Sequence, residues 1–139
     1  MTHPLSSRAL LVVAAGGALG ALGRYGIAEA FPVAPGTFPT TTFVVNIVGA
    51  FTLAALLEAL QRRGTPEHWT RLLVGVGLLG AFTTFSTMAT EIALLWRSGD
   101  GLLAVAYATA SVVAGVGAVF AGLVAAGFRA PPVPEEDEA

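Results

Sequence analysis

Long apolar runs fill most of the chain, and short polar or proline-rich segments separate them. A helix needs about 20 mostly apolar residues to cross a bilayer. The pattern predicts four such helices, over about 9–27, 40–60, 72–96 and 101–128. The first three are uncharged until Arg24, Glu58 and Glu91 respectively, and the fourth carries no charge. We therefore expect an all-α integral membrane protein with a single four-helix transmembrane domain over residues 1–129.

The segments between these runs have the composition of loops and turns. Residues 31–39 contain three prolines and a glycine, which end helices. Residues 61–71 are rich in charged side chains, as in a solvated loop. Residues 97–100 are short enough to make the third and fourth helices a hairpin. After Arg129 the chain is rich in Pro and then in Glu, so we expect a disordered acidic tail over 130–139.

The composition excludes several classes of function. Charged residues make up 12% of the chain, against about 25% in soluble domains. A net charge of −2 gives no reason to expect a nucleic-acid partner. The chain has no Cys, its two His lie at the terminus and in a loop, and no His, Asp and Glu cluster has metal-ligand spacing. We therefore expect no catalytic residues and no enzyme activity.

The arginines are unevenly divided between the two sides of the predicted domain. Four helices put both termini on one side of the membrane. That side holds five arginines and the other holds two: Arg8, Arg62, Arg63, Arg71 and Arg129 against Arg24 and Arg97. The positive-inside rule then favours cytoplasmic termini, in a multi-pass protein of the cell inner (plasma) membrane.

A glycine-rich stretch fills the first helix and ends in an arginine. Gly16 and Gly20 form a GxxxG face that lets two helices approach closely. Arg24 lies at membrane-interface depth. It is either an anchor whose side chain snorkels to the surface, or part of a positive vestibule that draws anions toward a pore.

Asn46 is the only asparagine in the chain and lies about one third of the way along the second helix. An intramembrane asparagine can hold two helices together. Its amide can also donate hydrogen bonds to an anion that has shed its water. Thr42 lies one turn earlier on the same face, so the two side chains could line one path.

A run of hydroxyl residues interrupts the third apolar segment. Three glycines come before Thr83, Thr84, Ser86 and Thr87. These hydroxyls could bond back within an intact helix. Alternatively the helix is broken, with main-chain carbonyls freed to bind a cation and hydroxyls turned to a pore. Broken backbone is tolerated in a membrane only where it is buried or lines a cavity. By periodicity alone, the phenylalanines here are core residues.

These three stretches, in this order and spacing, resemble the Fluc/CrcB family of fluoride channels. Its marks are a glycine-rich first helix ending in Arg, a Gly-Thr-Leu-x-Val-Asn motif, and Gly-x-Thr-Thr-Phe-Ser-Thr-Phe. The likeness runs from Gly16 to the fourth helix. It implies passive, fluoride-selective export through two pores of an antiparallel, dual-topology homodimer. Two positions depart from the family: Thr41 stands in place of Gly, and Met88 in place of the second Phe.

The resemblance also implies roles for individual residues. The carbonyls of Gly80 and Thr83 hold a structural sodium ion at the centre of the dimer. The resemblance places Asn46, Phe85, Ser86, Thr87, Tyr107 and Ser111 along the fluoride path. Met88 occupies the position of the family's second Phe, Thr42 joins the path by its spacing from Asn46, and Arg24 is the candidate vestibule residue. Fluoride is a strongly hydrated acceptor, so amide and hydroxyl donors and aromatic edges suit it.

Three alternatives remain open from the sequence. A non-transporting membrane subunit would also use glycines and hydroxyls for packing. A small proton-coupled transporter would need an acid within the membrane, and the first helix has none. The arginine bias fits poorly with equal insertion in both directions, so an oppositely oriented sibling chain could replace the second copy in a heterodimer.

Overall fold

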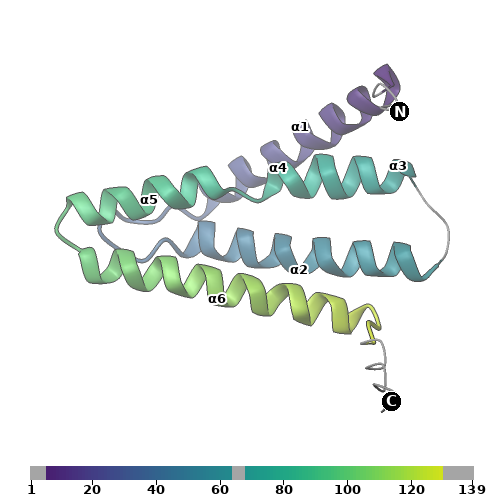
Figure 1. The fold of residues 1–139 in the computed structure, drawn as a ribbon. Helices are drawn as coiled ribbons and strands as arrows, with labels where there is room; N and C mark the ends of the chain where they lie inside the picture. Colours follow the sequence, from purple (N-terminus) through teal and green to yellow (C-terminus); the bar gives the residue numbers. More distant parts are fainter. Residues whose placement is uncertain (1–5, 64–67, 130–139) are drawn as a thin grey trace, which may run out of the picture.

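Four long helical spans make up the computed structural model, which describes residues 6–63 and 68–129 (Figure 1). All four are long and apolar enough to cross a membrane. The prediction of an all-α chain with four long apolar helices is therefore confirmed for the described residues, and this architecture is consistent with an integral membrane protein. The elements are α1 (Ser7–Ala30), α2 (Thr40–Arg62), α3 (His68–Thr70), the π-helix η1 (Arg71–Leu79), α4 (Gly80–Phe82), α5 (Phe85–Arg97) and α6 (Gly101–Ala125).

The ends of the helices differ from the predicted ends for local reasons. The first helix begins earlier, because the side chain of Ser6 accepts a hydrogen bond of 3.2 Å from the Ala9 N–H and caps it. The last helix ends three residues earlier, at Ala125. Gly127 adopts a left-handed φ of 91°, and its N–H donates to the Val124 carbonyl. The predicted tail, 130–139, lies outside the described residues.

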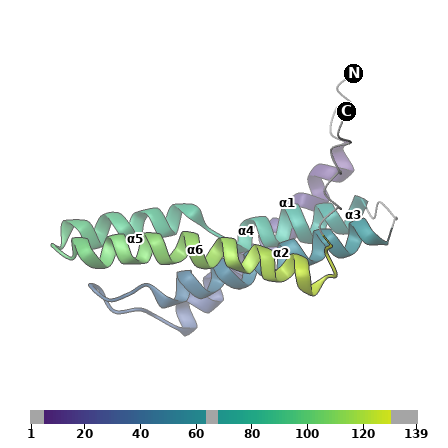
Figure 2. The same cartoon turned by 60° about the horizontal axis from the view of Figure 1, so that its bottom comes forward.

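The helices pack in pairs rather than as a closed bundle. Helix α1 runs beside η1 and α4, α2 packs against α6, and α5 and α6 form the predicted hairpin (Figures 1 and 2). The start of α1, the end of α2, α3 and the end of α6 all lie at one end of the molecule. We call it the arginine-rich end, because it carries Arg8, Arg62, Arg63, Arg71 and Arg129.

The glycines of α1 allow it to touch the third span directly. A Cβ added at Gly16 or Gly20 would collide with main-chain carbonyl oxygens of η1. From the other side, a Cβ at Gly77 would lie 2.7 Å from the carbonyl oxygen of Val13. The close helix approach predicted from the GxxxG face is confirmed.

A small core forms between α5, α6 and the segment before α2. Its buried members are Leu95, Ala104 and Tyr107, and Tyr107 is fully buried. The ring of Phe38 meets Tyr107 edge to face, with centroids 5.2 Å apart. Elsewhere few residues of the spans are buried by the rest of the chain. In the most apolar stretch of each span, at most 22% of the residues are buried within the single chain. The exposed apolar surface is available to lipid or to another protein chain.

Candidate functional site at the break in the third span

The third span is interrupted after Phe82. Thr83 and Thr84 adopt extended backbone conformations, with ψ of 152° and 116°. Thr84 then caps α5, because its Oγ1 accepts a hydrogen bond of 3.1 Å from the Thr87 N–H. Of the two interpretations of the hydroxyl run, the broken helix is correct and the intact helix is wrong.

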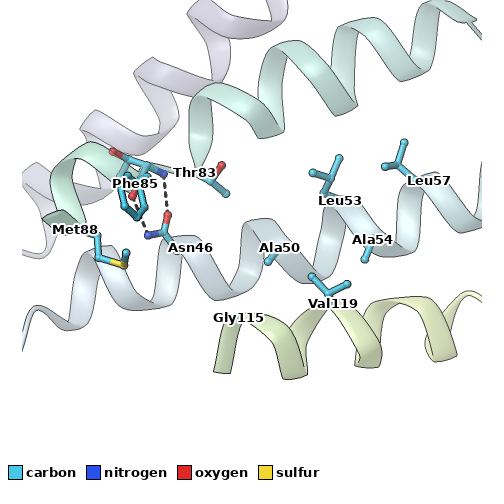
Figure 3. A pocket seen from close by; sticks show the side chains of 11 residues that line it. Asn46, Ala50, Leu53, Ala54, Leu57, Thr83, Phe85, Met88, Gly115 and Val119 are labelled. Atoms are coloured by element: carbon cyan, nitrogen blue, oxygen red, sulfur yellow. Dashed lines mark hydrogen bonds between the residues drawn. The ribbon is translucent and has the colours of Figure 1, made fainter. Parts of the chain in front are cut away.

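Asn46 closes the gap that this break leaves in the main-chain hydrogen bonds. Its Nδ2 donates to the Thr84 carbonyl at 3.0 Å, and its Oδ1 accepts from the Thr84 N–H at 2.8 Å (Figure 3). Both main-chain groups would otherwise lack partners. Asn46 therefore does hold two spans together. The amide has a second N–H, which these contacts leave free for another acceptor.

Gly49 makes room for the break one turn along α2. A Cβ at Gly49 would collide with the Cγ2 methyl of Thr83 and lie 3.4 Å from the ring of Phe82. Only glycine lets the extended segment approach α2 this closely. The contact with Asn46 therefore depends on a glycine that the sequence analysis did not single out.

The carbonyls at the end of the first half of the span have different partners. The Leu79 carbonyl accepts from the N–H and the hydroxyl of Thr83, at 3.1 and 3.0 Å. The Ala81 carbonyl accepts from Arg24 Nε at 3.2 Å, so Arg24 binds the break itself. Within the described residues, the carbonyls of Gly80 and Thr83 accept no such bond.

Those free carbonyls are the oxygen ligands that the site can offer a cation. The described residues contain no group of three His, Cys, Asp or Glu able to hold a metal. Main-chain oxygen suits a hard cation such as sodium. The chemistry of the donor set therefore fits the cation that the resemblance implies, although two carbonyls from one chain are too few to surround it.

Glu91 joins three helices and is the main site residue that the sequence analysis missed. Thr42 donates to Glu91 Oε1 and Tyr107 donates to Oε2, both at 2.7 Å. Each hydroxyl has a single O–H group, and each uses it to donate a hydrogen bond to this carboxylate. The sequence did hold a signal for this site. Glu91 is the one acid of α5, and Thr42 and Tyr107 were both already expected to line the fluoride path.

Further hydroxyl groups lie beside the break and, separately, on α6. Thr84 Oγ1 lies 2.9 Å from Thr87 Oγ1 and 3.3 Å from Ser86 Oγ, and the Ser86 side chain is exposed. On α6, one turn after Tyr107, the Ser111 hydroxyl is buried and has no hydrogen-bond partner among the described residues. A buried hydroxyl without a partner is costly unless a ligand or water meets it.

A cavity of about 470 Å³ lies against the break. Asn46, Phe85 and Met88 stand at one end of it, and the apolar side chains of α2 line the other (Figure 3). Phe85 is 77% exposed, whereas Met88 is half-buried and packs on the core around Tyr107. The remaining lining residues are Ala50, Leu53, Ala54, Leu57, Thr83, Thr84, Gly115 and Val119.

The fold and this site define a small helical membrane protein whose third span is broken beside a mostly apolar cavity that Asn46 also lines. The family described as "CrcB-like protein, Camphor Resistance (CrcB)" matches residues 11–123, and the chain belongs to that family.

Similar proteins cover nearly the same length. The fluoride-specific ion channel FluC 2 of Nocardia farcinica is 42% identical over 123 residues, which are 88% of each chain. The fluoride-specific ion channel FluC of Phenylobacterium zucineum is 46% identical over 123 residues, 86% of this chain and 95% of its own. FluC of Caulobacter sp. strain K31 is 44% identical over 120 residues, covering 84% and 93%.

Proposed function

We propose that this protein is a fluoride-selective ion channel that exports fluoride by passive permeation and so lowers cytoplasmic fluoride. The observation that carries the proposal is the Asn46 amide, held at the helix break beside a cavity that also contacts Phe85. The relatives that are named fluoride-specific ion channels support it, since they are 42% and 46% identical over nearly the whole chain. No enzyme activity is part of the proposal.

The proposed path replaces the water of fluoride with neutral donors. These are the second N–H of Asn46, the hydroxyls of Ser86, Thr87 and Ser111, and the positive ring edge of Phe85. Conduction needs several sites of moderate strength rather than one strong site. Arg24 lies beside the break, where its Nε donates to the Ala81 carbonyl. Its charge contributes positive potential there, so the proposed vestibule reaches as far as the break.

Thr42 and Tyr107 take part in this path through Glu91. Their hydroxyl protons point to the two carboxylate oxygens. We propose that these two bonds hold the carboxylate in a fixed position and spread its charge, which lowers its repulsion of a passing anion. Met88 lines the cavity where the family usually has a second aromatic ring, and it supplies polarizable contact but no ring edge.

The proposed assembly is an antiparallel homodimer of dual topology in the inner membrane. Two copies related by a two-fold axis near the break would double the free carbonyls of Gly80 and Thr83 and provide oxygen ligands for one structural sodium ion. The low burial of the single chain supports a second chain. The arginine-rich end favours one orientation, so an oppositely oriented sibling chain is the alternative partner.

Flux from liposomes distinguishes this proposal from its rivals. Purified protein is reconstituted into vesicles loaded with fluoride, and efflux is followed with a fluoride electrode, with and without a proton gradient. A passive channel releases fluoride at the same rate in both cases. A proton-coupled transporter needs the gradient, and a non-transporting subunit leaves the fluoride inside.

A further inference from the structure

The segment between α1 and α2 sends one aromatic ring into the core. Phe38 lies outside both helices, directly before Pro39, the N-cap residue of α2. Its ring meets the ring of Tyr107 on α6 edge to face, with centroids 5.2 Å apart and planes at 79°. It also meets the ring of Phe43 on α2, with centroids 5.4 Å apart and planes at 71°. A residue of the connecting segment therefore contacts both α2 and α6.

The two helices that Phe38 contacts are those that hold Glu91 on α5. Tyr107 of α6 donates to Glu91 Oε2 at 2.7 Å. Thr42 of α2, the residue before Phe43, donates to Glu91 Oε1 at the same distance of 2.7 Å. Tyr107 is fully buried, whereas Glu91 also lines a crevice of about 410 Å³ between the connecting segment and α5. The ring of Phe38 thus lies next to the residues that fix the carboxylate.

Phe38 gives the Tyr107 ring a directional contact. Leu95 and Ala104, the other buried members of this core, are aliphatic and set no preferred angle for a ring. An edge-to-face pair does set one, because the positive edge of one ring meets the negative face of the other. The hydroxyl of Tyr107 is attached to the ring, so the angle of the ring decides whether the hydroxyl reaches Glu91.

The segment around Phe38 is itself held in place. The Thr41 hydroxyl donates to the Phe31 carbonyl at 2.6 Å, which ties the start of α2 to the end of α1. The Thr40 N–H donates to the Phe38 carbonyl at 2.8 Å. Pro39 restricts the backbone of the residue before it to extended conformations. The backbone therefore presents the Phe38 ring to the core in one arrangement.

We propose that Phe38 is a positioning residue of the fluoride path, which aligns Tyr107 and, through Tyr107, the Glu91 carboxylate. The inference rests on the proposed channel function, in which the two bonds to Glu91 lower its repulsion of a passing anion. Without the Phe38 ring, Tyr107 turns to orientations that leave one carboxylate oxygen without its donor. The connection between the first two spans then takes part in conduction, and its role is more than that of a linker.

A spectroscopic test reads the position of Tyr107 without fluoride. The chain has two tyrosines, so Tyr25→Phe, at an exposed position, leaves Tyr107 as the only one. In this background the full-length protein is isotope-labelled at tyrosine Cζ, whose chemical shift depends on the hydrogen bond of the hydroxyl. Phe38→Leu should move the signal toward that of Glu91→Leu, which removes the acceptor. Phe31→Leu makes the same change at an exposed ring of the same segment and should leave the signal in place.

Fluoride flux through variants of Phe38 separates positioning from packing. Phe38→Leu should lower the flux per channel at least about twofold, as expected for the loss of one edge-to-face pair. Phe38→Tyr keeps the ring and should conduct like the parent protein. In a Tyr107→Phe background, Phe38→Leu should have no further effect, because the hydroxyl that it aligns is absent. A packing role predicts equal losses in both backgrounds.

A second variant keeps the test decisive. Phe38→Met fills a similar volume without a ring edge, and it replaces Phe38→Leu if the latter lowers the yield of folded protein. The inference is overturned if neither variant moves the Tyr107 signal, or if the flux loss is the same with and without the Tyr107 hydroxyl. A parent protein that conducts no fluoride overturns the channel function instead, and the Tyr107 signal then still decides whether Phe38 aligns the ring.

Discussion

Asn46 and Thr84 share two hydrogen bonds across the break, one to the Thr84 carbonyl at 3.0 Å and one from the Thr84 N–H at 2.8 Å. One side chain therefore replaces both main-chain partners that the broken helix has lost. The same amide keeps a free N–H beside the cavity. The position of the break and the donor offered to an anion thus depend on a single residue.

Asn46→Asp changes both roles of the amide at once. The new carboxylate still accepts from the Thr84 N–H, but it offers no donor to the Thr84 carbonyl or to fluoride, and it adds a negative charge to an anion path. We expect fluoride flux to fall at least about tenfold, while the protein still purifies as a dimer. Gln61→Glu makes the same chemical change at an exposed position near the end of α2 and should conduct normally. Aggregation of Asn46→Asp would instead assign Asn46 to packing alone.

Gly49→Ala tests whether the break must lie against α2. The added methyl group collides with Thr83, so the extended segment has to move away from Asn46. Thermal unfolding should show a loss of about 1–3 kcal/mol, as for other overpacked sites, and flux per channel should fall. Gly117→Ala is the control, because nothing lies within 4 Å of its added methyl. Equal stability of the two variants would show that the approach of the break to α2 is not required.

Phe85 and Met88 lie on one side of the cavity but differ in what they contact. Phe85 is 77% exposed, whereas Met88 packs on the core. Because an aliphatic group has no positive edge, Phe85→Ile should cut flux strongly. Met88→Ile should reduce flux less, and Met88→Phe should be tolerated. Flux per channel is measured beside dimer yield. Parental conduction by Phe85→Ile would contradict the proposed role of its ring.

The carbonyls of Gly80 and Thr83 predict a dependence on sodium. A cation that binds only the folded dimer raises its stability as its concentration rises. Replacing sodium by N-methylglucamine should therefore lower the melting temperature. Thr83→Val keeps the carbonyl and should keep the sodium dependence, although it loses the hydroxyl bond to Leu79. A melting temperature that is independent of sodium in the parent protein would contradict this prediction.

The four spans could be predicted because their signal is local: each is a long apolar run bounded by charge, proline or glycine. The break was one of two interpretations, since the same hydroxyls can bond within an intact helix. The broken helix is stabilised by the two hydrogen bonds of Asn46 to Thr84, and these residues lie 38 positions apart in the sequence. The contact of Arg24 with Ala81 spans 57 residues and that of Thr42 with Glu91 spans 49. Such pairs depend on how the helices pack, which the apolar pattern does not specify.

The central claim is selective, passive permeation of fluoride, and anion efflux tests it most directly. Vesicles with a known number of channels are loaded with equal fluoride and chloride, and the two effluxes are followed by ion-selective electrodes under the same electrical driving force. The account predicts rapid loss of fluoride and retention of chloride, because neutral donors around Asn46 and Phe85 suit a small, strongly hydrated ion. Equal loss of both anions, or retention of both, would contradict it.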